Sequence, residues 1–182
     1  LAVIEAEIER VNKIIKQFLD FARPRPPSLE PMDARTVLEE TLALLIYEIE
    51  AQGVSLERQY ADGLPPVPMD REQMKQVFLN LILNALQAMD GGGGLKIFTV
   101  LRNRPSVAGK APSVEIAIQD TGAGIAEEIK SKVFEPFFST KEEGIGLGLP
   151  IAQRIVEEHG GEIRVESSPG EGTTFYIALP LK

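Results

Sequence analysis

The sequence predicts an α/β fold for residues 32–182, with one amphipathic helix ahead of it. Two observations carry this interpretation: segments with helical apolar spacing alternate with short strand-like runs, and glycine or proline clusters separate them. A third observation sets the N-terminal part aside, because its apolar residues repeat in a heptad pattern. The chain has 182 residues, enough for one domain and an appendage.

Composition and charge narrow the classes of function. With 19 basic and 27 acidic residues the formal net charge is −8, so we expect no nucleic-acid partner and no membrane contact by this chain. The lack of cysteine excludes disulfides and thiolate metal sites, and a single histidine excludes a His-based zinc site. We find no membrane span and no signal-peptide pattern, so we expect a cytoplasmic chain and leave membrane anchoring of a parent protein open.

Residues 1–22 predict a helix with one apolar seam, formed by Leu1, Ile4, Ile8, Val11, Ile15, Phe18 and Ala22. Such a stripe needs a partner helix, and no N-cap residue precedes it, so we expect the chain to begin inside a longer helix or hairpin. The prolines that follow end the helix and form a stiff linker. We therefore divide the chain into a truncated helix (1–23), a Pro-rich linker (24–31) and a domain (32–182).

The elements of the domain follow from caps, breakers and periodicity. Asp33 caps a helix to about Gln52. The residues expected on its buried side are Val37, Leu38, Leu42, Leu45 and Ile49. Asp70 caps a second helix to about Met89, with Gln73 at capping-box spacing from Asp70. Glycines 91–94 end the second helix. The remaining predicted elements are strands at Val54–Tyr60, Leu95–Arg102, Val114–Asp120, Ile163–Ser167 and Thr173–Leu179, and a helix at Leu149–Glu158.

The helix over residues 70–89 is apolar nearly all round, yet Asn80, Asn84 and Gln87 line one of its faces. A buried amide without a partner costs about 1–3 kcal/mol, so these side chains need hydrogen bonds or a ligand. One interpretation is a polar stripe that bonds to neighbouring backbone. The alternative is an amide row that faces a polar ligand or a hard cation, which prefers oxygen ligands.

The segment from Asp120 to Ile125 reads DTGAGI and directly follows a strand rich in Ile and Val. A carboxylate at a strand end can accept a hydrogen bond from an exocyclic amine. Gly122 and Gly124 permit positive φ and a close approach of ligand to backbone. A plain turn is the alternative explanation.

The segment from Gly144 to Gly148 reads GIGLG and opens a helix, whose N-terminus favours phosphate. Lys141 adds a cation that could reach a terminal phosphate; a ligand-free loop and a solvated lysine are the alternatives. The aromatic segment 134–138 beside it packs either under a mobile lid or in the ordinary core. We expect a structural role for His159, in the last turn of its helix.

The order of these motifs resembles the sensor histidine kinases of two-component systems. QVFLNLILNALQAM, DTGAGI, FEPFFSTK and GIGLGLPIA are similar to the N, G1, F and G2 boxes of that family, and HGGEIRVESSPGEGTTFYIALP is similar to the end of its catalytic domain. Upstream, EIERVNKIIKQFLDFARP resembles the second helix of the dimerisation and histidine-phosphotransfer hairpin. The short lid, 139–145, and the wording FEPFFSTK resemble the nitrogen-regulation-like branch.

The resemblance implies the Bergerat ATP-binding fold of the GHKL superfamily, a two-layer α/β sandwich with a mixed sheet packed on about three helices. It implies ATP and Mg²⁺ as cofactors, with Asn84 as the metal ligand and Asp120 as the acceptor of the adenine amino group. Carried over by position, the other nucleotide-binding residues are Asn80, Gln87, Ala88, Gly122, Gly124, Ile125, Lys141, Gly144, Gly146, Leu147, Gly148 and Thr173.

Two departures from related proteins refine the expectation. Gyrase- and Hsp90-like members place a Glu general base one turn before the metal Asn, where this chain has Asn80; an amide is a poor base, so ATP hydrolysis should be weak. The phosphoacceptor His of the kinases lies on the first hairpin helix, which this sequence does not contain. We therefore assign no catalytic residue and expect binding of Mg·ATP without autophosphorylation.

In the full-length protein the resemblance implies in-line transfer of the γ-phosphate to that His and then to an Asp of a response-regulator receiver domain. A homodimer is the expected state of the full-length protein. Two alternatives remain open: an anti-sigma-type serine protein kinase, which shares the nucleotide residues, and a non-catalytic dimerisation or scaffold module with a dead nucleotide site.

Overall fold

The structure, a computed structural model, describes residues 25–102, 112–140 and 144–181. Its strands are β1 (Glu30–Met32), β2 (Val54–Tyr60), β3 (Val67–Met69), β4 (Gly93–Arg102), β5 (Ser113–Asp120), β6 (Glu162–Ser168) and β7 (Gly172–Pro180). Its helices are α2 (Ala34–Ala51), α3 (Arg71–Ala88), α4 (Glu127–Lys130) and α5 (Gly148–Glu158). The helix predicted over residues 1–22 lies outside the described residues.

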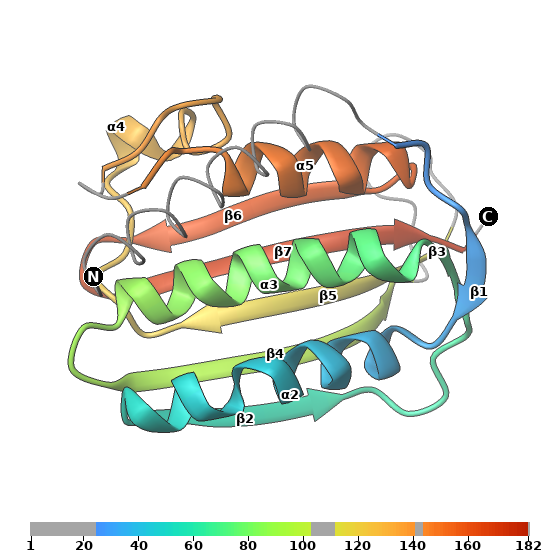
Figure 1. The fold of residues 1–182 in the computed structure, drawn as a ribbon, viewed down its shortest axis with the longest axis horizontal. Coiled ribbons are helices and arrows are strands. Elements are labelled where there is room, and N and C mark those ends of the chain that lie inside the picture. The colour runs from blue at the N-terminus through green and yellow to red at the C-terminus, as the bar shows by residue number, and fades with distance from the viewer. Residues whose placement is uncertain (1–24, 103–111, 141–143, 182) are drawn as a thin grey trace, which may run out of the picture.

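One mixed sheet forms the first layer, with the strand order β2-β4-β5-β7-β6. β2 and β4 are parallel, and the other neighbours are antiparallel. Parallel neighbours need a crossover, and α3 lies in the segment that joins β2 to β4. Figure 1 shows α2, α3 and α5 on one face of the sheet, as the second layer. The predicted two-layer α/β sandwich with a mixed sheet on about three helices is confirmed.

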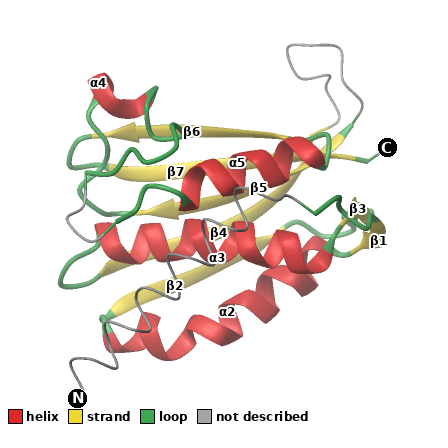
Figure 2. Cartoon of the chain, turned by 45° about the horizontal axis from the view of Figure 1, so that its top comes forward, coloured by secondary structure: helices red, strands yellow, loops and turns green. Residues whose placement is uncertain are grey.

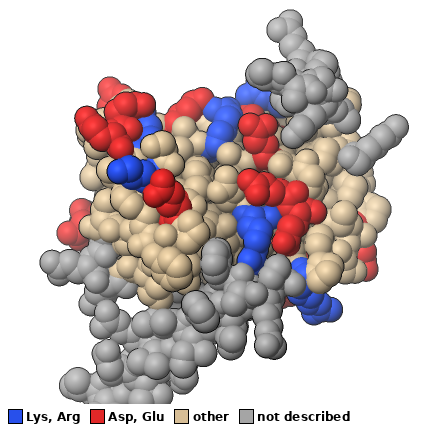
Figure 3. All heavy atoms as spheres, turned by 90° about the horizontal axis from the view of Figure 1, so that it is seen from above, with Lys and Arg blue, Asp and Glu red and all other residues tan. Residues whose placement is uncertain are grey.

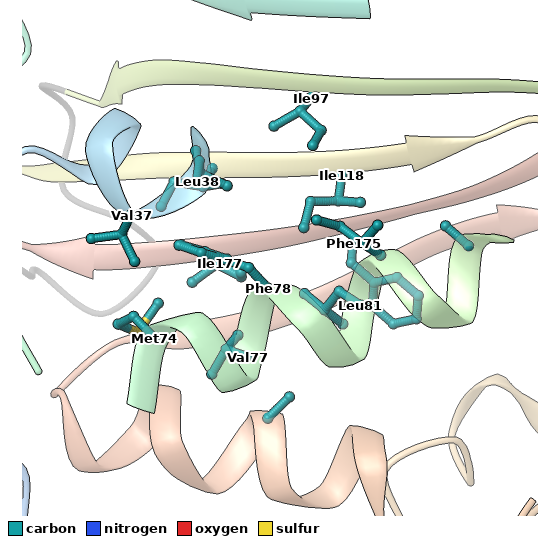
Figure 4. Close-up of a cluster of buried hydrophobic side chains, with 14 of the residues drawn as sticks. Val37, Leu38, Met74, Val77, Phe78, Leu81, Ile97, Ile118, Phe175 and Ile177 are labelled. Carbon is teal, nitrogen blue, oxygen red and sulfur yellow. The ribbon is translucent and has the colours of Figure 1, made fainter. Parts of the chain in front are cut away.

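The core lies between the two layers, with α3 in the middle of the helices. Figure 4 shows side chains of α2 and α3 beside Ile97, Ile118 and Ile177 of the sheet. The fully buried side chains of α3 include Met74, Val77, Phe78, Leu81, Ile82 and Leu86. The five α2 residues predicted on its buried side are buried as well: Val37, Leu38, Leu42, Leu45 and Ile49. Burial of this continuous apolar layer is the main stabilising term of the fold.

The helix caps follow the prediction in part. Asp33 Oδ1 accepts the N–H of Arg35 at 2.9 Å, and Asp70 Oδ1 accepts the N–H groups of Glu72 and Gln73 at 3.1 Å each. The expected reciprocal bond of a capping box is absent from α3. Instead, the side-chain Nε2 of Gln73 donates to the carbonyl oxygen of Arg25 at 2.7 Å, because the segment ahead of β1 passes over this helix end.

Three short elements were not predicted. β1 and β3 form a separate antiparallel pair, with Glu30 opposite Met69. α4 has four residues and no side-chain cap, so its sequence carries no helical period. Among the described residues, none of the helices combines the length and the hydropathy needed to cross a membrane.

The domain has two opposite ends, which are built from different elements (Figure 2). At one end lie α4 with its flanking loops, the C-terminus of α3, the N-terminus of α5 and the end of β5. At the opposite end lie β1, β3, the N-terminus of α3 and the C-terminus of α5. The motif residues of the sequence gather at the first end.

Candidate functional site

Asp120, the last residue of β5, is a buried carboxylate whose exposed fraction is 3%. Its Oδ1 accepts hydrogen bonds from the backbone N–H groups of Gly122 at 2.8 Å and of Thr173 at 3.3 Å. Thr173 lies opposite Asp120 in the β5–β7 register and is itself buried. Burial of a charge is strongly unfavourable without such donors, so these two amides hold the carboxylate in place.

The two glycines after Asp120 lie so close to neighbouring backbone that a side chain would not fit. A Cβ atom on Gly122 would lie 2.5 Å from the carbonyl oxygen of Ala88, and one on Gly124 would lie 2.0 Å from that of Ser168. Gly124 has the expected positive φ, whereas Gly122 does not. The N–H of Ala123 also donates to the carbonyl oxygen of Ala88 at 3.2 Å. The loop is thus held between the end of α3 and the β6–β7 turn.

Ser167, near the end of β6, was missed by the sequence analysis. Its Oγ accepts the N–H of Ile125 and donates to the carbonyl oxygen of Gly172, each at 2.8 Å, and lies 2.9 Å from Thr173 Oγ1. A serine hydroxyl can donate only one hydrogen bond, and Ser167 donates its bond to the carbonyl oxygen of Gly172. In the third contact, the hydroxyl of Thr173 is therefore the donor. Only the strand register, which places Ser167 opposite Thr173, could have revealed this connection.

The amide row of α3 is engaged at its first member. Asn80 Nδ2 donates to the carbonyl oxygen of Gly148, the first residue of α5, at 3.0 Å. For Asn80 the structure therefore shows the backbone-bonding arrangement that was one of the two interpretations. Asn84 lies one turn further along the same face and is half-buried, while Gln87 is exposed.

The glycine-rich segment before α5 packs against the aromatic segment. Gly146 has a φ of +71°, and a Cβ atom there would lie 2.4 Å from the carbonyl oxygen of Phe138. The side chain of Leu147 is buried, so it presents only its backbone to a ligand. Gly144 is exposed, and Lys141 lies outside the described residues. α5 begins without a side-chain cap.

The aromatic segment divides into two roles. Phe134 packs edge-on against Phe175, with ring centroids 6.3 Å apart, so the core-packing alternative holds for Phe134. Phe137 is 60% exposed and has a φ of +66°, and its N–H donates to the carbonyl oxygen of Gly146 at 3.0 Å. The lid expected over residues 139–145 is described only in part.

His159 has the structural role that its position predicted. It is 5% exposed, and its Nδ1 lies 2.7 Å from the carbonyl oxygen of Ile155. Its Nε2 accepts the N–H of Asp70 at 2.9 Å. Both ring nitrogens are therefore engaged by backbone groups: Nε2 is the acceptor, and the contact of Nδ1 with a carbonyl oxygen requires a proton on Nδ1.

The charged side chains and the metal-binding capacity of the described residues are as follows. On the face seen in Figure 3, acidic and basic side chains are interspersed. Among the described residues there is no group of three or more His, Cys, Asp or Glu side chains that could hold a metal ion. A metal at this end of the domain would need oxygen ligands from an amide such as Asn84 and from a bound ligand.

Comparison with known proteins gives matches over most or all of the chain. The model of the family described as "Histidine kinase-, DNA gyrase B-, and HSP90-like ATPase" matches residues 69–182. The signal transduction histidine-protein kinase AtoS of Escherichia coli strain K12 is 39% identical over 181 residues, which cover 100% of this chain and 29% of AtoS. The sensory histidine kinase/phosphatase NtrB of Rhodobacter capsulatus is 38% identical over 184 residues, which cover 98% of this chain and 51% of NtrB.

Among solved structures, histidine kinase ThkA in complex with the response regulator protein TrrA has a TM-score of 0.79 and 28% sequence identity. The alignment covers 99% of this chain and 50% of that one. The chain thus spans about 29% to 51% of the curated relatives named above. It belongs to the histidine kinase-, DNA gyrase B- and HSP90-like ATPase family, as an ATP-binding catalytic domain of the two-component sensor histidine kinase type.

Proposed function

We propose that this domain binds Mg·ATP along the C-terminal half of α3, with adenine at Asp120 and the phosphates at the start of α5. One observation carries this proposal: a single helix connects the two clusters. Ala88 touches the loop after Asp120, and Asn80 touches Gly148. The two α3 residues are eight positions apart, or about 12 Å of helix, so a ligand lying along α3 reaches both clusters.

At the base end, the Asp120 carboxylate accepts a hydrogen bond from the exocyclic amine of adenine. Guanine carries a carbonyl oxygen at that position, which a carboxylate would repel, so Asp120 selects adenine. Gly122, Gly124 and Ile125 line the base, and Thr173 supports it through water. Gln87 and Ala88 form the edge of the site at the end of α3.

Mg²⁺ is held by the side-chain oxygen of Asn84 in this proposal. Asn84 lies on α3 between the two clusters, and an amide oxygen suits a hard cation. The described residues offer no acidic metal cluster, so the remaining ligands come from phosphate oxygens and water. Binding of the metal is then coupled to binding of ATP, and the metal supplies charge neutralisation in a chain of net charge −8.

The phosphates lie at the N-terminus of α5, which has no side-chain cap and whose dipole favours anions. Gly144, Gly146, Leu147 and Gly148 present backbone to them, and Lys141 contributes a cation. Asn80 holds this helix end in place through Gly148. The domain thereby positions the γ-phosphate and neutralises its charge, which is the main requirement for phosphoryl transfer.

The acceptor of the γ-phosphate is a histidine ahead of residue 1 in the parent protein. His159 does not serve, because both of its ring nitrogens are held by backbone groups. Transfer to a response-regulator receiver domain follows; the complex of the similar kinase ThkA with TrrA supports this partner. The parent protein acts as a homodimer in this scheme, which assigns the seam of residues 1–22 to its hairpin.

Calorimetric titration with a non-hydrolysable ATP analogue tests the nucleotide site. We expect binding that Mg²⁺ strengthens and that GTP does not reproduce. Equal affinity for ATP and GTP would contradict the role of Asp120, and the absence of binding would support a scaffold module.

Incubation with ATP labelled at the γ-phosphate tests the acceptor. We expect no acid-labile label on this chain, because its only histidine is structural. Label that survives base and is lost in acid would overturn this assignment.

A further inference from the structure

The end of the domain opposite the nucleotide site contains a junction built around Asp70. Its Oδ1 caps α3 through the N–H groups of Glu72 and Gln73, at 3.1 Å each. Its Oδ2 accepts the N–H of Ser28 at 2.9 Å. Its own N–H donates to Nε2 of His159, which follows α5, at 2.9 Å. One residue thus connects α3, the end of α5 and the segment ahead of β1.

The segment 25–32 makes two further attachments to the same region. Gln73 Nε2 donates to the carbonyl oxygen of Arg25 at 2.7 Å, and β1 pairs with β3 up to Met69, the neighbour of Asp70. The segment 25–32 therefore contacts the domain in three places: at Arg25, at Ser28 and along β1. Three contacts within eight residues leave this segment little freedom to move as a flexible tether. The segment that the sequence presents as a linker is therefore fastened along its length to the N-terminus of α3.

The attachment is stiff on both sides. Pro26 and Pro27 precede Ser28, and proline restricts the backbone to an extended conformation. On the other side, α3 and α5 run from the junction toward the nucleotide end (Figure 1), and Asn80 of α3 bonds to Gly148, the first residue of α5. Arg71 and Lys75 of α3 also form ion pairs with Glu40 of α2, which connect this end of α3 to α2.

We propose that Asp70 is a positioning residue, which clamps the segment 25–32 to α3 and α5 and so fixes the point at which the preceding chain leaves the domain. The proposal rests on the proposed function, because a fixed point of departure matters only if the γ-phosphate is delivered to a group ahead of the linker. The junction acts on delivery and leaves nucleotide affinity unchanged.

Asp70→Asn isolates the linker contact. The asparagine oxygen can replace Oδ1 as the helix cap, since Asn is a good N-cap residue, whereas its NH₂ group faces the N–H of Ser28 and cannot accept from it. Ser28→Pro removes the donor from the other side of the contact. Ser28→Ala keeps the backbone N–H and is the matched control.

Spin labels on two exposed positions can measure the distance between the linker and α2. The chain has no cysteine, so Arg25→Cys and Glu48→Cys provide unique attachment points on the linker and on α2. We expect one narrow distance distribution in this background and with Ser28→Ala, and a broader one with Asp70→Asn or Ser28→Pro. The double variant Asp70→Asn with Ser28→Pro should be no broader than either single variant, because both remove the same bond.

Two further measurements separate the outcomes. Urea unfolding establishes that each variant is folded. Calorimetry then gives the dissociation constant for a non-hydrolysable ATP analogue with Mg²⁺, which should stay within about twofold of the parent value in every variant. Unchanged distance distributions in the folded variants would overturn the junction. Lack of nucleotide binding by the unsubstituted chain would instead overturn the proposed function and leave the distance result intact.

Discussion

The side-chain amide of Asn80 donates to the carbonyl oxygen of Gly148 at 3.0 Å, and so joins the middle of α3 to the first residue of α5. A second contact, from Asp70 to His159, joins the other ends of the two helices. The contacts are ten residues apart on α3 and eleven on α5, or about 15 Å and about 17 Å of helix. The stretches of the two antiparallel helices between these contacts are thus similar in length, and the start of α5 is fixed beside the half of α3 that carries Asn84.

Substitutions of Asn80 should lower the free energy of unfolding in a graded way. Asn80→Ala removes one hydrogen bond and should cost about 1 kcal/mol. Asn80→Asp should cost more, about 2–3 kcal/mol, because a carboxylate cannot donate to the Gly148 carbonyl and would place a half-buried charge against it. Urea unfolding at pH 7 gives the order. An Asp variant as stable as the parent chain would show that the contact does not hold α5.

The long elements could be predicted because their signals are local. Asp33 and Asp70 mark helix starts, and the apolar spacing of α2 identified its buried face correctly. β1 and β3 could not be predicted, because each has three residues with a proline in the middle and pairs only with the other. Proline normally argues against a strand, and only the tertiary pairing of Pro31 with Pro68 permits this one.

Asn84→Ala should remove the Mg²⁺ dependence of nucleotide binding. If the Asn84 amide oxygen holds the metal, affinity for the ATP analogue in the presence of Mg²⁺ should fall to about the level measured with a chelator. Calorimetric titration with and without Mg²⁺ measures both values. Asn84→Asp is the informative companion, because it keeps an oxygen ligand and should retain the Mg²⁺ dependence. A fully Mg²⁺-dependent Asn84→Ala variant would refute the metal assignment.

Asp120→Asn should separate the binding role of Asp120 from its structural role. The asparagine oxygen can still accept from the N–H groups of Gly122 and Thr173, so the free energy of unfolding should change by less than about 1 kcal/mol. Affinity for the ATP analogue should fall about 10–100-fold, the range of one hydrogen bond to a charged acceptor. The preference for ATP over GTP should shrink as well. An unchanged preference would place the base elsewhere.

The sequence motifs located the site, but they did not give each residue its role. Asp120 and the glycines after it occur in the expected order. Gly122, however, is needed because the carbonyl of Ala88 packs where a Cβ atom would lie, and no local sequence pattern predicts that contact. Ser167 has no motif at all, and its bonds to Ile125, Gly172 and Thr173 depend on the β6–β7 register. The contacts that shape the site are long-range, and a local pattern cannot specify them.

Two glycines of the β6–β7 turn offer a matched test of close packing. Gly170 and Gly172 both have positive φ, +78° and +88°, so alanine is strained at either position. A Cβ atom on Gly170 would meet nothing within 4 Å, whereas one on Gly172 would lie 2.0 Å from the carbonyl oxygen of Asp120. Gly170→Ala should cost about 1 kcal/mol of unfolding free energy, from backbone strain alone.

Gly172→Ala should cost at least about 3 kcal/mol, because the backbone around Asp120 must also move. It should weaken nucleotide binding in proportion, since the displaced residue is the proposed base acceptor. Urea unfolding and calorimetry on both variants give the comparison. Similar values for the two would mean that the turn relaxes without moving Asp120.

The Asp70 junction should be lost in acid. Burial raises the pKa of Asp70, but the hydrogen bonds from the backbone N–H groups of Ser28, Gln73 and Glu72 outweigh it, and the net effect is a pKa below the ordinary value. A carboxyl whose pKa is lower in the folded than in the unfolded chain stabilises the fold in full above its unfolded pKa. That contribution disappears as the pH falls through the folded pKa.

The difference in unfolding free energy between the parent chain and Asp70→Asn should therefore be about 1 kcal/mol at pH 7 and decline below about pH 4. Protonated Asp70 resembles asparagine, so the two chains should approach equal stability as the pH falls through the folded pKa of Asp70. Urea unfolding at intervals from pH 7 to 3 measures the difference, with Asp90→Asn, at an exposed position after α3, as the control. A difference that stays constant across this range would show that the ionised carboxylate of Asp70 contributes nothing to the junction.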